Sequence, residues 1–144
     1  MSKKIAVGYD GSDSAGGALE FAVTLAKASG AELVIAHVLE WSPYSFLTPT
    51  EIEERHKRRT EELERAESAV IKPVMGKLEE EGVTAKCVLK YGHIAETLNM
   101  IATDEGVDQI VIGRNGHSQL SSRLFGSVAG SLAQAASVPV TIVP

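Results

Sequence analysis

A polar segment punctuated by glycine, residues 113–127, follows a short apolar run and leads into a helical pattern. Within this segment Gly113, Gly116 and Gly126 carry no Cβ atom that would obstruct their backbone N–H groups. Ser127 stands where the helical pattern begins, and a helix N-terminus offers unpaired donors and a partial positive charge. A loop of this kind can cradle a phosphate group. The same residues also allow a simpler interpretation, in which the glycines only form turns and Ser127 only caps its helix.

A second group of candidate residues, Gly8, Tyr9 and Asp10, ends the first apolar run of the chain. A carboxylate at the end of a strand can accept hydrogen bonds from ribose hydroxyls, whereas it would repel a phosphate. In the sequence Asp-Gly-Ser-Asp the Asp10 carboxylate could instead cap the helix that follows or close a turn. Both interpretations of Asp10 are compatible with the residues alone.

The elements that must position these residues alternate along the chain. Five short runs rich in Val and Ile predict strands, at 5–8, 33–38, 85–89, 109–112 and 140–143. Helical spacing fills the intervals, with a kink or break expected at Pro73 in the longest helix. The runs are almost continuously apolar, as in parallel strands that are covered on both faces. The sequence therefore predicts an α/β fold, a three-layer doubly wound parallel sheet of five strands with helices on both faces.

Ligands of such sheets bind at the carboxyl ends of the strands, where the strand order reverses. If the order is 3-2-1-4-5, the reversal lies between the first and the fourth strand. The carboxyl ends of these strands are Gly8-Tyr9-Asp10 and Ile112-Gly113, which are the two places where the unusual chemistry occurs.

The spacing of Gly113, Gly116, Gly126 and Ser127 is glycine, two residues, glycine, nine residues, glycine and serine. This pattern resembles the nucleotide loop of the universal stress protein family. The resemblance continues at 5–12, Val38, Tyr91-Gly92, 108–113 and 138–140. It implies the strand order 3-2-1-4-5 and, for the subgroup with this loop, ATP bound with its phosphates on the loop.

Similar proteins hold the adenosine end near the first strand and the backbone of the residue matching Val38, with Val128 following the phosphate-binding serine. The nucleotide-binding residues implied by the resemblance are Gly8, Tyr9, Asp10, Val38, Ile112, Gly113, Gly116, Gly126, Ser127 and Val128. Mg²⁺ is expected to accompany the triphosphate as a charge-neutralising ion. The four histidines and Cys87 lack metal-ligand spacing, so no metal site built by protein alone is expected.

The loop lacks the Gly-Lys-Ser/Thr lysine of a P-loop, and no second carboxylate follows at a neighbouring strand end to hold magnesium. We therefore assign no catalytic residue. The sequence favours a regulatory, stress-response module that binds ATP, acts on a partner protein or an assembly, and has little or no turnover. A slow ATPase or phosphotransferase, and a binder of AMP or cyclic AMP, are the alternatives.

Two other functions share the predicted architecture. A phosphorylated receiver domain would need an aspartate at the end of the third strand, where Lys90-Tyr91 stand. A flavodoxin-like protein would place its phosphate loop after the first strand, beside the unfavourable charges of Asp10 and Asp13. Both functions fit the sequence poorly.

The balance of charge and apolar residues narrows the partners further. The chain has 144 residues, with 14 basic against 19 acidic side chains and a net charge of -5. Because both signs are mixed without a basic stripe, nucleic acid is not an expected partner. No apolar stretch approaches the roughly 18 residues that span a bilayer, so no membrane insertion is expected. The length suits one domain, residues 1–144.

The N-terminal sequence MSKKIAVGYD has too few apolar residues for a signal sequence, and the single cysteine cannot form an internal disulfide. We therefore expect a cytoplasmic location.

The last predicted strand, Val140-Thr141-Ile142-Val143, would lie at a sheet edge and carries no charge. An unprotected apolar edge invites another strand, and a symmetric antiparallel dimer would close two such edges at once. Similar universal stress proteins dimerise in this way. The alternative is that the preceding loop folds over the edge.

Overall fold

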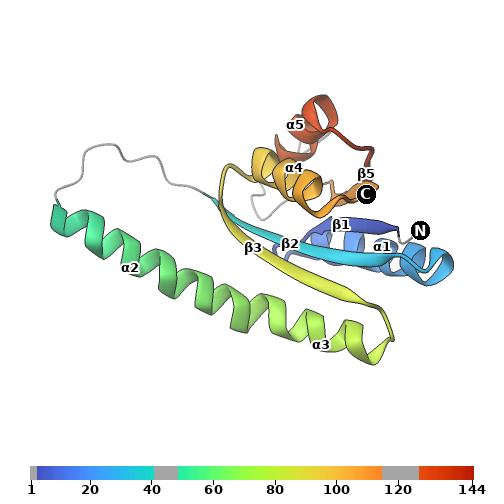
Figure 1. The fold of residues 1–144 in the computed structure, drawn as a ribbon, viewed down its shortest axis with the longest axis horizontal. Helices are drawn as coiled ribbons and strands as arrows, with labels where there is room; N and C mark the ends of the chain where they lie inside the picture. The colour runs from blue at the N-terminus through green and yellow to red at the C-terminus, as the bar shows by residue number, and fades with distance from the viewer. Residues whose placement is uncertain (1–2, 41–48, 115–126) are drawn as a thin grey trace.

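The computed structural model describes residues 3–40, 49–114 and 127–144. Its five strands form one sheet in which every pairing is parallel (Figure 1). They are β1 (Lys4–Gly8), β2 (Glu32–Glu40), β3 (Ala85–Gly92), β4 (Gln109–Gly113) and β5 (Val140–Val143). The order is β3-β2-β1-β4-β5. The predicted fold class and strand order are confirmed.

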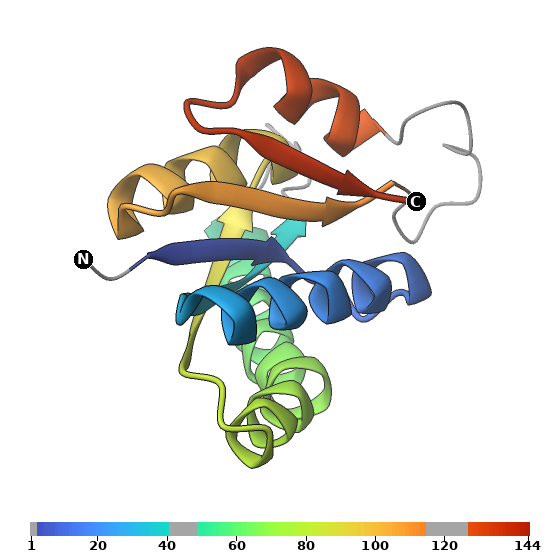
Figure 2. The same cartoon turned by 90° about the vertical axis from the view of Figure 1, so that its right-hand side faces the viewer.

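Helices cover both faces of this sheet (Figure 2). They are α1 (Asp13–Ser29), α2 (Pro49–Ala66), the π-helical turn η1 (Glu67–Ile71), α3 (Lys72–Glu80), α4 (Ile94–Glu105) and α5 (Ser127–Ala135). One apolar cluster joins α1, η1 and α3 to the sheet, and a second joins α4 and α5 to the opposite face.

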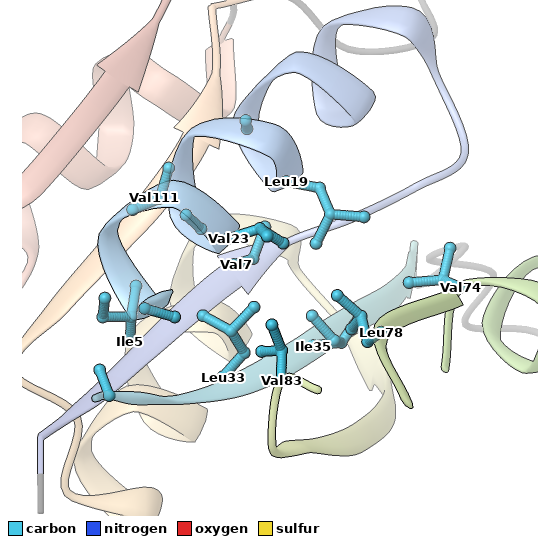
Figure 3. Close-up of a cluster of buried hydrophobic side chains, with 14 of the residues drawn as sticks. Ile5, Val7, Leu19, Val23, Leu33, Ile35, Val74, Leu78, Val83 and Val111 are labelled. Carbon is cyan, nitrogen blue, oxygen red and sulfur yellow. The ribbon is translucent and has the colours of Figure 1, made fainter. Parts of the chain in front are cut away.

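Successive residues of the central strands enter different clusters because side chains alternate across a strand. In β1, Ile5 and Val7 pack under α1, whereas Ala6 packs toward α4. Leu33 and Ile35 of β2 meet Leu78 and other side chains of α3 in the first cluster (Figure 3). Burial of a side chain of this size stabilises the fold by about 1.5–3 kcal/mol.

Helix α1 has a defined signal at each end. The Ser12 hydroxyl accepts a hydrogen bond from the Ala15 N–H at 3.2 Å, which makes Ser12 the N-cap. At the other end Gly30 has φ of 71°, and its N–H donates to the Ala26 carbonyl at 2.8 Å. The left-handed glycine ends the helix where the sequence predicts it.

The break expected at Pro73 occurs one turn earlier, as a π-helical turn. The Lys72 N–H reaches back five residues to the Glu67 carbonyl, and Pro73 then stands in the first turn of α3. Proline has no N–H to donate and is tolerated in a first turn. The continuous helical stripe of the sequence is therefore divided into three pieces.

Figure 1 shows the first turns of α2 projecting beyond the carboxyl end of β2. Most of its charged side chains are exposed, as predicted for a solvated face. Two contacts hold α2 to the end of β3: the Tyr91 hydroxyl donates to the Glu62 carboxylate, and the Arg59 guanidinium lies 5.3 Å from the Tyr91 ring centroid. Within the described ranges no helix has the length and apolarity to cross a membrane.

Candidate functional site

The strand order reverses between β1 and β4, which pair in parallel from Ile5↔Gln109 to Val7↔Val111. Their carboxyl ends therefore lie side by side. A Cβ atom built on Gly8 would stand 3.0 Å from Cγ2 of Ile112. Two of the predicted site residues, one from each strand, are thus packed against each other at the reversal.

Gly113 brings the end of β4 against the first turn of α1. A Cβ atom at this position would lie 2.6 Å from the Ser14 carbonyl oxygen and would also meet the Ser14 hydroxyl. Only glycine allows so close an approach to the backbone of another element. The next residue, Arg114, donates its N–H to the Val143 carbonyl at 2.8 Å, so the pairing with β5 extends one residue past the end of β4.

The Asp10 carboxylate organises the turn between β1 and α1. Its Oδ1 accepts from the Ser12 N–H at 2.9 Å and from the Ser12 hydroxyl at 2.5 Å. Gly11 between them has φ of 82°, a conformation that favours glycine. Asp10 is thus a turn residue, and the helix cap is Ser12. A carboxylate offers about four acceptor positions, so this turn is compatible with hydrogen bonds to a ligand.

His37 is a buried polar residue near this reversal to which the sequence pattern assigned no role, because its spacing fits no metal site. The side chain is 6% exposed, and its Nδ1 lies 2.6 Å from the Tyr9 carbonyl oxygen. It thus connects the interior of β2 to the residue that follows β1. The available signal was a polar residue within an apolar strand, directly before Val38.

Val38 points to the opposite face of β2 and packs against the cluster under α4. Val128 joins the same cluster from the start of α5. Ser127 is the first residue of α5, as the sequence predicts, and Figure 2 shows this helix start at the same edge as the carboxyl ends of β4 and β5. Gly116 and Gly126 lie outside the described residues. Among the described residues no group of three His, Cys, Asp or Glu side chains could hold a metal ion.

The match of the whole chain to known proteins decides its family. The model of the universal stress protein family matches residues 1–144. The chain belongs to this family. Universal stress protein YxiE of Bacillus subtilis is 33% identical to it, with 99% of each sequence aligned.

Solved structures of universal stress proteins share the fold. Universal stress protein MJ0577 of Methanocaldococcus jannaschii superposes with a TM-score of 0.82 at 27% identity, covering 99% of this chain and 96% of that one. A universal stress protein in complex with cAMP superposes with a TM-score of 0.64 at 25% identity, covering 99% and 97%. The family predicted from the sequence is thereby confirmed, whereas the ATP-binding subgroup stays a prediction.

Proposed function

We propose that this universal stress protein binds ATP, accompanied by Mg²⁺, in the crevice between the carboxyl ends of β1 and β4. The proposal rests on two features that lie together where the strand order reverses. The Asp10 turn ends β1, and Gly113 ends β4 against the first turn of α1. Doubly wound sheets bind ligands at this position. A related protein of this fold in complex with cAMP supports an adenine nucleotide as the ligand.

In this proposal the adenosine end lies against β1 and β2. The Asp10 carboxylate, oriented by Ser12, accepts hydrogen bonds from the ribose hydroxyls. The backbone of Gly8, Tyr9 and Val38 lines the base and the sugar. Ile112 lies beside Gly8 and supports it from the core, where Ile112 is only 4% exposed.

The phosphates lie toward the segment that joins β4 to α5. Backbone N–H groups at Gly113, Gly116 and Gly126 donate to the phosphate oxygens, and the start of α5 at Ser127-Val128 adds unpaired helix donors. Mg²⁺ bound to the triphosphate reduces the repulsion between its oxygens. Magnesium is held by the nucleotide rather than by a cage of protein ligands.

The proposed role is regulatory, in the cytoplasm, with the bound nucleotide altering a partner protein or an assembly. Turnover is expected to be slow because the loop sequence has no P-loop lysine to stabilise the transferred phosphate. Sustained phosphate release at several per second, lost on mutation of Asp10 or Ser127, would instead establish an ATPase.

Mass spectrometry of nucleotide released from the purified protein by denaturation tests the ligand directly. We expect ATP, and calorimetric titration of the emptied protein should then give a higher affinity for ATP with Mg²⁺ than for AMP or cAMP. Release of AMP or cAMP would revise the ligand. A protein that contains no nucleotide and binds none of the three would overturn the proposal.

A homodimer through β5 is a second proposal, supported by the position of this strand at the sheet edge. The carbonyls of Pro139 and Val143 accept hydrogen bonds from β4. Because strand groups alternate in direction, the Thr141 N–H also faces β4, and the Ile142 N–H faces outward. Among the described residues no strand pairs with the outward N–H and C=O groups, and an antiparallel strand of a second copy would bind them.

Proline substitutions separate the two sides of β5. Thr141→Pro removes a donor to β4 and should destabilise the fold, whereas Ile142→Pro should give a folded monomer. Sedimentation equilibrium with circular dichroism measures both effects. A parent protein that stays monomeric at high micromolar concentration, with and without ATP, would refute the dimer.

A further inference from the structure

His37 is a buried polar side chain on the face of β2 that packs under α3 and η1. Only 6% of its surface is exposed, and Leu33 and Ile35 on the same face of the strand are completely buried. Nδ1 lies 2.6 Å from the Tyr9 carbonyl oxygen. Because a carbonyl can only accept, Nδ1 must carry the proton and donate it.

The hydrogen bond begins where the pairing of β1 with β2 ends. The register runs to Gly8↔Ala36, and the Tyr9 N–H still donates to the Ala36 carbonyl at 2.9 Å. Beyond that bond the chain turns toward α1, and the Tyr9 carbonyl accepts from the His37 side chain. An imidazole extends farther from its strand than a backbone N–H does. The His37 side chain can therefore bind the Tyr9 carbonyl where the chain has begun to leave the sheet.

The carbonyl that His37 holds belongs to the peptide unit that joins Tyr9 to Asp10. A peptide unit is planar, so fixing its oxygen fixes the direction in which the chain enters Asp10. Oδ1 of Asp10 then accepts hydrogen bonds from the N–H and the hydroxyl of Ser12, and Ser12 caps α1. Hydrogen bonds on either side of the Tyr9–Asp10 peptide bond therefore link the interior of β2 to the first turn of α1.

We propose that His37 is a positioning residue for the nucleotide site and sets the orientation of the Asp10 turn relative to Val38. The proposal rests on the proposed function for its effect on affinity. His37 does not touch the nucleotide. It holds the end of β1 at a fixed place beside β2, so that the groups for the base and the ribose are arranged before the ligand arrives.

Three variants at two neighbouring positions test the role. His37→Leu keeps the apolar bulk and removes the donor, and it should raise the Kd for ATP with Mg²⁺ about ten-fold, as expected for one lost hydrogen bond. His37→Asn can place an amide N–H near the position of Nδ1 and should bind within about three-fold of the parent. Ile35→Val, two residues earlier on the same face, should lower stability slightly by loss of a methylene and leave the Kd unchanged.

Hydrogen exchange provides a measurement that does not depend on nucleotide. In His37→Leu the amides of Tyr9 and Ser12 should exchange about ten-fold faster than in the parent, and His37→Asn should restore most of their protection. Ile35→Val should not change these two amides selectively. In the parent, the long-range ¹H–¹⁵N NMR spectrum should show the His37 proton on Nδ1.

The outcomes distinguish this inference from the proposed function. If the parent binds ATP and His37→Leu binds equally tightly, the positioning role is wrong and nucleotide binding stands. If the parent binds no nucleotide, the proposed function fails, and the exchange of Tyr9 and Ser12 still shows whether His37 orders the turn. A proton found on Nε2, or unchanged exchange in His37→Leu, overturns the inference.

Discussion

The two ends of the sheet use their polar groups in different ways. At the amino ends of the strands, polar groups of the backbone and the side chains bond to one another. The Lys4 N–H donates to the Asp108 carboxylate at 3.0 Å, and the Asp108 N–H donates to the Lys4 carbonyl at 2.8 Å. Lys86 of β3 forms an ion pair of 2.8 Å with Glu105 at the end of α4. This end is held together by contacts within the protein.

At the carboxyl ends the chain turns away from the sheet, and its polar groups orient a turn. His37 holds the Tyr9 peptide, Asp10 holds Ser12, and glycines stand where β1 and β4 meet their neighbours. In every right-handed crossover the helix begins at this end of the sheet, so unpaired N–H donors gather here and helix C-termini gather at the other. Chain direction in a parallel sheet therefore puts the contacts that stabilise the fold at one end and the proposed binding crevice at the other.

The largest effect on ATP binding is expected from substitutions in the proposed phosphate loop at the carboxyl end of the sheet. Gly116→Val together with Gly126→Val should abolish ATP binding, because side chains would occupy the approach to the backbone donors. The far-UV circular dichroism should stay that of the folded parent. Calorimetric titration decides the matter, and a double variant that binds ATP like the parent would place the phosphates elsewhere.

A second prediction compares two glycines. Gly113→Ala should destabilise the protein by about 1–3 kcal/mol, because the new Cβ atom overlaps the backbone of Ser14. Gly76→Ala in α3 is the matched control: its Cβ would meet no described atom within 4 Å. It should stabilise the helix by about 0.5–1 kcal/mol. Urea unfolding measures both changes, and equal midpoints for the two variants would contradict the close approach of β4 to α1.

The smallest effect is expected from the ion pair at the amino end. The hydrogen bond from Lys86 lowers the pKa of Glu105 and outweighs the opposing effect of desolvation, and the charges of Lys86 and Lys4 lower this pKa further. A carboxyl whose pKa is lower in the folded state adds stability above its unfolded pKa. That stability is lost as the pH falls through the folded pKa. Lys86→Ala should therefore be less stable than the parent near neutral pH. This difference in stability should disappear in acid.

Carbon-detected NMR titration of Glu105 provides the direct measurement for this pair. In Lys86→Ala the pKa of Glu105 should move back toward its ordinary value. Lys90→Ala, at the other end of the same face of β3, is the control and should leave that pKa where it is in the parent. A pKa that is identical in Lys86→Ala and in the parent would show that the ion pair does not form in solution.

Local sequence patterns determined the strands, the helix ends and the family of this protein. Val and Ile runs specify strands because a β-strand covered on both faces needs an apolar residue at nearly every position. Gly30 ends α1 because only a residue without Cβ enters the left-handed conformation at little cost. These choices depend on neighbours along the chain, so they are readable before any tertiary contact is known.

The tertiary structure decided which contacts individual residues make. His37 has a partner 28 positions earlier, at Tyr9, and no spacing along the sequence connects them. Gly113 reads as a loop glycine, but its need for glycine arises from the backbone of Ser14 in another element. The sequence alone left Asp10 open between a cap and a turn, and the structure assigned the cap to Ser12. The contacts of His37 and Gly113 join elements that are distant in the chain, which local propensity does not encode. The choice between Asp10 and Ser12 is local, but it depends on the geometry of the turn rather than on residue type.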